Sequence, residues 1–333
     1  MMTIHAYAAL EPKDVLQPFT YEPEALGEYD VQVEITHCGV CHSDIHIIDG
    51  DWGHHHPAVA GHEIIGIVRD RGARVNQIEV GQRVGIGWQS SSCLECEWCT
   101  QGHENVCEKS SATCRDNFGG FAETIYADAR FVYAIPEALD SVNAAPLLCA
   151  GITVYAPLSR HVNASSKVGV IGIGGLGHLA LQYARAMGCE VTAFSTTPEK
   201  EAEAREFGAD HFVNTRDEAQ MKAMRNTLDY ILCTVNVQLD WRAYLRMLRP
   251  FGTFCMVGAV PGDLAISSGH LVGGERVVTG SSVGNRSSMR EMLEFSARHN
   301  IIAQTEVMPM SEVNAALNRV RNNEARYRIV LEN

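Results

Sequence analysis

Four cysteines with regular spacing lie in one short segment of the chain. Cys93, Cys96, Cys99 and Cys107 follow the pattern Cys-x2-Cys-x2-Cys-x7-Cys. Four thiolates in a short loop can close a tetrahedral zinc site, and such a site leaves no position open for a substrate. We therefore predict a structural zinc ion here. An iron–sulfur cluster is the main alternative, and a zinc ribbon that binds nucleic acid would use similar spacing.

Residue types that could bind a second zinc ion are spread along the chain. Cys41 belongs to Cys41-His42-Ser43-Asp44, His62 belongs to Gly61-His62-Glu63, and Cys149 comes much later. Each of these residues alone is more often structural than a ligand. Together, two cysteines and a histidine could hold zinc with the fourth position open to water or substrate.

A glycine-rich stretch has the pattern of a dinucleotide-binding turn. Gly172, Gly174 and Gly177 form G-x-G-x-x-G; Gly175 and Leu176 stand inside it, after an apolar stretch that ends at Ile173. Such glycines allow a tight turn and let backbone amides approach a pyrophosphate at a helix N-terminus. We predict nucleotide binding. A glycine-rich turn in a parallel sheet without a ligand is the alternative.

The residues after the next predicted strand favour NADP(H) over NAD(H). An NAD site usually places Asp or Glu about 20 residues beyond the first glycine, where it holds the ribose 2′-hydroxyl. This chain has Ser195, Thr196 and Thr197 there, followed by Lys200, with Glu199 as the first carboxylate. Hydroxyls and an ammonium suit a 2′-phosphate. Alternatively, these residues only cap the next helix.

The composition and net charge of the chain argue against some classes of binding partner. The 333 residues include 27 basic and 40 acidic ones, a formal net charge of −13, and 46% are hydrophobic. An acidic surface repels phosphate backbones and anionic membranes, so we predict neither nucleic acid nor a membrane as partner. No membrane span or secretory signal is apparent, so we expect a cytoplasmic protein whose eleven cysteines stay reduced.

The pattern of predicted elements gives an α/β fold with two domains. The first part has alternating strands with few helices, whereas the second alternates strands and helices, as in a parallel sheet covered on both faces. The strands predicted in the first part are 31–35, 64–68, 83–86 and 121–127, with a last strand at 327–331 that returns to this domain. In the second part we predict strands at 168–173, 190–194, 211–213, 230–234, 253–257 and 277–280, and helices at 176–187, 198–207, 217–224 and 240–248, with a further helix at 287–299.

Taken together, the motifs resemble those of a zinc-dependent medium-chain alcohol dehydrogenase of the cinnamyl alcohol dehydrogenase group. The match includes residues 41–44, 61–63, the four-cysteine segment, 119–123, 149–153 and 172–178. The resemblance implies a GroES-like catalytic domain, formed by residues 1–150 and 285–333 with a zinc-binding lobe. It also implies an NADP-binding Rossmann domain at 151–284, a doubly wound parallel sheet.

The resemblance also implies roles for individual residues around the catalytic zinc. Cys41, His62 and Cys149 would bind the metal, Glu63 could enter its coordination sphere, and Asp44 would orient the imidazole. A plain buried salt link is the alternative for Glu63 and Asp44. A proton would leave the substrate through Ser43 and the cofactor ribose to His46. Trp52 and Trp88 are predicted to line an apolar substrate cleft between the domains, with ordinary core packing as the alternative. A solvated loop is the preferred interpretation of His54, His55 and His56.

Further residues are predicted to contact the cofactor by the same resemblance. Beyond the glycine-rich turn and 195–200, they are His42, Thr153, Val257, Ser281, Val283 and Arg328. The implied reaction transfers hydride between NADP(H) and a primary alcohol or aldehyde, aromatic ones included. Family members are often homodimers, which we expect here. The alternatives are a zinc polyol dehydrogenase and a catalytically silent nucleotide-binding sensor.

Overall fold

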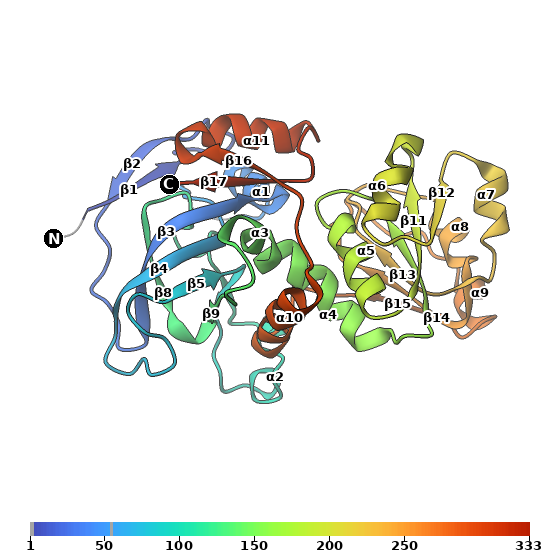
Figure 1. Cartoon of the computed structure of the whole chain (residues 1–333), viewed down its shortest axis with the longest axis horizontal. Coiled ribbons are helices and arrows are strands. Elements are labelled where there is room, and N and C mark those ends of the chain that lie inside the picture. The colour runs from blue at the N-terminus through green and yellow to red at the C-terminus, as the bar shows by residue number, and fades with distance from the viewer. Residues whose placement is uncertain (1–2, 54–55) are drawn as a thin grey trace. The chain divides into compact units, whose positions relative to one another are not determined.

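The structure, a computed structural model, describes residues 3–53 and 56–333 of the chain (Figure 1). It divides into two compact units. Unit 1 comprises Met1–Cys149 and Asn285–Asn333, and unit 2 comprises Ala150–Gly284. Unit 1 therefore contains both ends of the chain, and unit 2 is inserted between its two segments.

Unit 1 is built on a seven-stranded sheet. In spatial order its path runs β16 (Thr305–Pro309), β17 (Arg328–Glu332), β3 (Asp30–Val40), β4 (Glu63–Arg71), β5 (Arg83–Ile86) and β9 (Val132–Ala134), with β8 (Thr124–Asp128) also paired to β3. The alternation of Val31, Val33 and Ile35 is confirmed, because all three are buried while the polar residues between them are not. The predicted return of the C-terminal strand is confirmed by the antiparallel pairing of β17 with β3.

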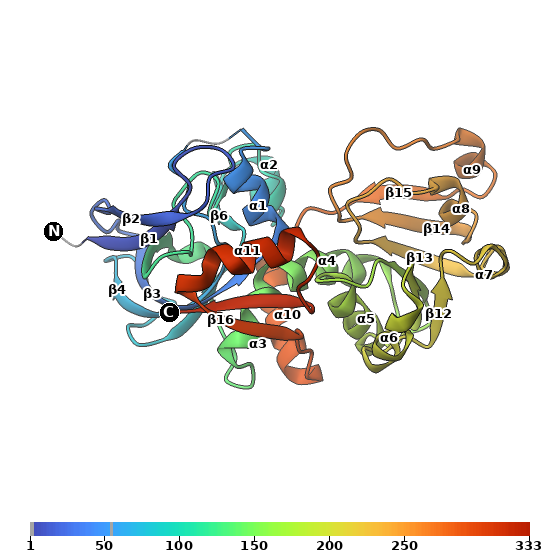
Figure 2. The same cartoon turned by 90° about the horizontal axis from the view of Figure 1, so that it is seen from above.

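Smaller elements complete unit 1. Two short hairpin-like pairs join β1 (Ile4–Ala8) with β2 (Gln17–Tyr21) and β6 (Gln89–Ser91) with β7 (Ser111–Ala112). The helices are α1 (His42–Asp49), α2 (Glu97–Thr100), α3 (Ser141–Pro146), α10 (Arg286–His299) and α11 (Val313–Arg321). Figures 1 and 2 show α11 lying along β16 and β17, where its buried residues Val313, Ala316 and Leu317 pack against the sheet. Neither α1 nor α11 was predicted from the sequence.

Unit 2 is a parallel sheet of six strands. The spatial order is β12 (His211–Asn214), β11 (Glu190–Ser195), β10 (Lys167–Ile171), β13 (Leu228–Cys233), β14 (Leu248–Met256) and β15 (Val277–Gly280). The connecting helices are α5 (Gly177–Ala186), α6 (Glu201–Glu206), α7 (Glu218–Ala223), α8 (Trp241–Leu245) and α9 (Ser268–Val272). The predicted alternation of strands and helices is confirmed. The strand order reverses between β10 and β13, which is where open α/β sheets bind ligands.

One apolar helical stretch runs from Ser141 to His161, through α3, a π-helical turn at Leu147–Gly151 and α4 (Ile152–His161). Pro146, Gly151 and Pro157 stand inside this run of the sequence. The helix continues through them, and the π-helical turn follows Pro146, which has no N–H to donate. The 21 residues are long and apolar enough to cross a membrane, but 83% of the apolar window is buried inside the structure, as in a core helix.

Candidate active site

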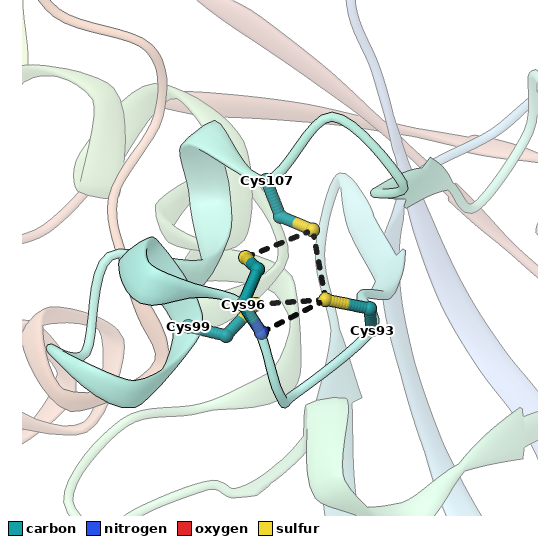
Figure 3. Close-up of side chains that lie close together, drawn as sticks. All are labelled: Cys93, Cys96, Cys99 and Cys107. Carbon is teal, nitrogen blue, oxygen red and sulfur yellow. Dashed lines mark hydrogen bonds between the residues drawn. The ribbon is translucent and has the colours of Figure 1, made fainter.

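The four predicted cysteine ligands lie together at one end of unit 1. Figure 3 shows their sulfur atoms facing one another, with Cys93 Sγ 3.6 Å from Cys107 and 3.8 Å from Cys99, and Cys96 Sγ 3.9 Å from Cys107. Tetrahedral coordination with Zn–S bonds of about 2.3 Å separates two sulfur atoms by about 3.8 Å. The cluster therefore fits a closed, structural zinc site. We call the segment from Cys93 to Cys107 the lobe.

The second metal-binding group is also present, and it is entirely buried. The ligand atoms of Cys41, His62, Glu63 and Cys149 all lie within 4.8 Å of one another. Cys41 is the N-cap of α1, Glu63 is the first residue of β4, and Cys149 lies in the π-helical turn. Two sulfur atoms, one imidazole and one carboxylate are all ligand types that zinc binds.

Asp44 organises this group from the first turn of α1. Its Oδ2 accepts the N–H of Cys41 (2.9 Å), while Oδ1 accepts the N–H of Gly61 (2.8 Å) and Nδ1–H of His62 (2.7 Å). The His62 tautomer is thereby fixed, and its Nε2 lies 3.2 Å from Sγ of Cys149. Burial alone would lower the pKa of His62, but the charge of Asp44 holds it well above its usual range. The arrangement is the one that orients a metal-bound imidazole.

Glu63 forms a buried salt link, the alternative considered for this residue, and its partner was not predicted from the sequence. Its Oε1 is paired with the guanidinium of Arg328, and both side chains are buried. Burial raises the pKa of Glu63 to about 7, against the opposing charge of Arg328. Oε2 of Glu63 has no hydrogen-bond partner among the described residues. It lies so close to Gly39 that a Cβ there would stand 2.0 Å from it, so position 39 must be glycine.

The structure thus gives Arg328 a different contact from the one expected. It pairs with Glu63 at the metal group, and its contact with the cofactor phosphates stays a prediction. The sequence shows only an arginine at the start of the last strand, in Arg326-Tyr327-Arg328, and nothing that points to Glu63. β17 pairs with β3, and β3 pairs with β4. Arg328 at the start of β17 and Glu63 at the start of β4 therefore lie close together in the sheet.

The predicted proton path includes a second carboxylate, Asp51. Nδ1 of His46 lies 2.7 Å from Oδ2 of Asp51, and the imidazole stacks on Trp52 with ring centroids 4.9 Å apart. A hydrogen bond from Nδ1–H leaves Nε2 of His46 as the proton acceptor. Ser43, at the N-terminus of the same helix, has no hydrogen-bond partner for its hydroxyl among the residues described. The Asp51 contact was not predicted from the sequence.

The two predicted pocket tryptophans are in contact beside the metal group. Trp52 and Trp88 meet edge to face with ring centroids 5.7 Å apart, and Trp88 meets His62 in the same way at 5.0 Å. Trp52 is 40% exposed, which argues against simple core packing for this residue. His56 contacts the backbone oxygen of Ile48 (3.3 Å) and belongs to no metal-capable group formed by the described residues, which do not include His54 and His55.

In unit 2 the glycine-rich turn follows β10 directly. Gly172 has φ +88°, and Cβ at Gly177 would stand 1.8 Å from the oxygen of Gly172, so neither position tolerates a side chain. Gly174 borders open space, and α5 begins without a side-chain cap at Leu176. The backbone amides of this turn and helix start are therefore suited to a pyrophosphate.

The residues predicted to hold the 2′-phosphate follow β11. Oγ of Ser195 accepts the N–H of Thr197 (3.1 Å), and Nζ of Lys200 donates to the oxygen of Ile173 (2.7 Å), which places the ammonium beside the glycine-rich turn. Thr196 and Thr197 are exposed. The remaining predicted cofactor contacts in unit 2 have these positions: Thr153 buried in α4, Val257 after β14, and Ser281 and Val283 after β15. Carboxyl ends of parallel strands are the expected place for a dinucleotide.

His42, also predicted to contact the cofactor, is the first residue of α1 in unit 1. Its ring centroid lies 6.1 Å from that of His46. Burial lowers the pKa of His42, so the neutral imidazole is favoured.

Comparison with known proteins agrees with this geometry. Residues 27–137 match the alcohol dehydrogenase GroES-like domain, and residues 175–298 match the zinc-binding dehydrogenase family. Aldehyde reductase AdhA of Synechocystis sp. is 42% identical over 98% of this chain and 98% of its own length. The chain belongs to the zinc-binding dehydrogenases.

Solved structures of this family have the same fold. A cinnamyl alcohol dehydrogenase of Sorghum bicolor matches with a TM-score of 0.95 and 37% identity, covering 99% of this chain and 98% of that one. A cinnamyl alcohol dehydrogenase of Helicobacter pylori, solved with NADP(H), matches with a TM-score of 0.91 and 32% identity. This match covers 99% of this chain and 98% of that one. The chain is accordingly an oxidoreductase of the alcohol dehydrogenase and aldehyde reductase type.

Proposed function

We propose that this zinc-binding dehydrogenase interconverts primary alcohols and aldehydes, aromatic ones included, with NADP(H) as cofactor. The assignment of NADP(H) rests on the end of β11, where Ser195, Thr196 and Thr197 stand in place of the usual carboxylate. Lys200 lies next to the turn through its bond to Ile173. A 2′-phosphate would be repelled by a carboxylate at this place and attracted by hydroxyls and an ammonium.

The residues of unit 1 supply binding and proton transfer. When bound by Cys41, His62 and Cys149, zinc would act as a Lewis acid on the substrate oxygen, and the nicotinamide would exchange the hydride. Ser43, whose hydroxyl has no partner among the described residues, is free to bond the substrate oxygen. His46, held by Asp51 at 2.7 Å, would act as the base that accepts the proton when the cofactor is bound. A positioned base of this kind typically contributes about 10²–10⁴-fold to the rate.

The preference for aromatic substrates rests on Trp52 and Trp88. Their rings meet edge to face beside His62, and they offer an apolar wall on which a second aromatic ring can pack. A polyol, by contrast, requires several hydrogen-bonding side chains around its hydroxyls. The names of similar proteins include both classes, since a probable mannitol dehydrogenase of Fragaria ananassa is 41% identical to this chain.

The test is a substrate panel assayed with both nicotinamide cofactors. Benzylic, cinnamyl and aliphatic primary alcohols, their aldehydes, and mannitol and sorbitol are compared by kcat/KM. We expect aromatic aldehydes with NADPH to give the highest values. Higher kcat/KM for the polyols would support the polyol dehydrogenase alternative, and higher values with NAD(H) would refute the cofactor assignment.

We also propose that the enzyme is a homodimer joined through the free edge of the unit 2 sheet. β15 is the last strand in that sheet, and Val277, Val272 and Phe251 near it are 49%, 78% and 71% exposed. An edge strand with exposed apolar side chains is a template for pairing with a second copy. Val277→Lys should therefore yield monomers in light scattering, while Val307→Lys on β16, the edge strand of the other sheet, should not. Monomeric wild-type protein would contradict the proposal.

We place the enzyme in the cytoplasm. All eleven cysteines are unpaired in the structure, and the ligand thiols of both metal groups require a reducing compartment to remain available.

A further inference from the structure

One carboxylate of the lobe differs from the others in its environment. Glu104 lies between the ligands Cys99 and Cys107 and is only 2% exposed, whereas Glu95, Glu97 and Glu108 are exposed. Burying a carboxylate is unfavourable unless it is paired and hydrogen-bonded. Its position therefore calls for partners that compensate for the lost hydration.

One carboxylate oxygen of Glu104, Oε1, has its partners at the start of α10, while Oε2 has no hydrogen-bond partner among the described residues. Its Oε1 accepts the backbone N–H of Arg286 (2.6 Å) and Nε–H of the same residue (2.9 Å). The guanidinium also lies over the ring of Phe131, 5.2 Å from the centroid. A negative charge at the first turn of a helix is stabilised by the free N–H groups there. Glu104 thus fixes the lobe to the 14-residue helix that begins where the chain returns to unit 1.

The backbone of Glu104 makes a second connection, toward the active site. Its carbonyl oxygen accepts a hydrogen bond from Nε2 of Gln89 (2.7 Å), and Gln89 is itself buried. Gln89 begins β6 and directly follows Trp88, whose carbonyl oxygen accepts the N–H of Thr113 (2.8 Å). The ring of Trp88 lies edge-on to His62 at 5.0 Å. A continuous series of contacts therefore runs from the lobe to the imidazole of the catalytic metal group.

We propose that Glu104 is a positioning residue that links the lobe to the substrate wall. By anchoring its turn to α10, Glu104 holds its own carbonyl in place for Gln89, and Gln89 in turn fixes Trp88 against His62. The lobe then does more than stabilise the fold, since its geometry sets the position of Trp88. The proposed effect on substrate binding rests on the proposed function, whereas the effect on the position of Trp88 does not.

The experiment uses the zinc-loaded enzyme labelled with 5-fluorotryptophan. The chain has four tryptophans, so four ¹⁹F resonances are expected, and Trp88→Phe identifies one of them. Glu104→Ala and Gln89→Ala should both shift or broaden the Trp88 resonance and leave that of Trp241 in place. Glu108→Ala is the matched control in the lobe and should change neither. Zinc content is measured for every variant, so that metal loss is distinguished from displacement of Trp88.

Kinetics supply the second measurement. For an aromatic alcohol, each of the two variants should raise KM by about threefold to tenfold, the range expected for one lost hydrogen bond, with kcat within about twofold. The double variant should resemble the larger single effect, because both residues act through the same contact. Additive effects, or an unchanged Trp88 resonance in folded Glu104→Ala, would overturn the proposal.

A folding failure would not leave the proposal undecided. Should Glu104→Ala not fold, Gln89→Ala removes the link while leaving the ion pair with Arg286 intact. Glu104→Gln, which keeps an acceptor oxygen for the Arg286 N–H, should preserve the Trp88 resonance. If the wild-type enzyme fails to use aromatic alcohols, the proposed function is wrong, and the ¹⁹F spectra still decide whether Glu104 positions Trp88.

Discussion

Asp44 and His62 are joined by a hydrogen bond of 2.7 Å, and neither side chain is exposed to solvent. The same carboxylate also accepts the N–H groups of Cys41 and Gly61, at 2.9 Å and 2.8 Å. One side chain therefore fixes the start of α1, the turn before β4 and the orientation of the imidazole. Two metal ligands, Cys41 and His62, depend on it directly.

Asp44→Asn should weaken zinc binding at the catalytic group. The amide cannot accept on both sides as the carboxylate does, and loss of such a partner typically lowers metal affinity by about 10–100-fold. The measurement is zinc content after dialysis against a graded chelator series. Asp49→Asn, on the same helix but outside the metal group, is the control. Equal zinc retention in wild type and Asp44→Asn would contradict the assigned role.

Fully active enzyme should contain two zinc ions per chain, one held by the four cysteines of the lobe and one held by Cys41, His62 and Cys149. Cys99→Ser should lower thermal stability, since metal binding contributes to the folding free energy. Cys41→Ser should abolish turnover while leaving the circular dichroism spectrum close to that of the wild type. Elemental analysis gives the metal content, and a single zinc ion in fully active protein would refute the two-site assignment.

His46→Gln should slow alcohol oxidation, and most strongly at low pH. The base that receives the substrate proton is then missing, and hydroxide can replace it only as the pH rises. Asp51→Asn should change the rate in the same direction by a smaller factor, because it removes only the group that orients the imidazole. The check is the pH dependence of kcat for both variants, with His211→Gln as the control. A profile for His46→Gln identical to that of the wild type would remove His46 from the proton path.

Thr196→Asp should shift the cofactor preference from NADP toward NAD. The wild type should favour NADP, and a charge-assisted contact to the 2′-phosphate accounts for about 10–100-fold of that preference. The ratio of the two kcat/KM values is the quantity to compare, with Thr196→Asn as the uncharged control. An unchanged ratio in the aspartate variant would show that this residue does not face the phosphate.

The ion pair between Asp49 and Arg321 should give a pH-dependent contribution to stability. A bond of 2.6 Å joins these residues of α1 and α11, and the Arg321 hydrogen bond lowers the pKa of Asp49 below its usual value of 3.8. A carboxylate whose pKa is lower in the folded state stabilises the fold at pH values above its unfolded-state pKa. This contribution disappears as the pH falls through the folded-state pKa. Because Arg321 is partly exposed, the gain should be about 1 kcal/mol or less.

Urea unfolding of wild type and Asp49→Asn at pH 7 and pH 3 tests this expectation. The variant should be less stable at pH 7, and the difference should shrink at pH 3. Asp70→Asn, on an exposed part of β4, controls for the general effect of removing a carboxylate. A difference that stays constant or grows toward low pH would contradict the role of the ion pair.

Local pattern was sufficient for much of this protein. The lobe ligands lie within fifteen residues of each other, so their spacing alone predicts a shared metal. Alternating Val31, Val33 and Ile35, and the glycines from Gly172 to Gly177, depend on backbone geometry that acts over a few residues. The same holds for Ser195 to Thr197, where the absence of a carboxylate is visible in the sequence itself. Features that depend on short-range interactions can therefore be predicted directly from the order of the residues.

Only the tertiary structure decided which distant residues meet. Arg328 reaches Glu63 because β17 pairs with β3, and Gln89 reaches Glu104 because the lobe folds back on β6. Neither contact is visible in the sequence, because an arginine such as Arg328 or a glutamine such as Gln89 is equally acceptable at an exposed site. α1 and α11 escaped prediction for a related reason: their short apolar stripes are stabilised by packing against the sheet, which local propensity does not contain.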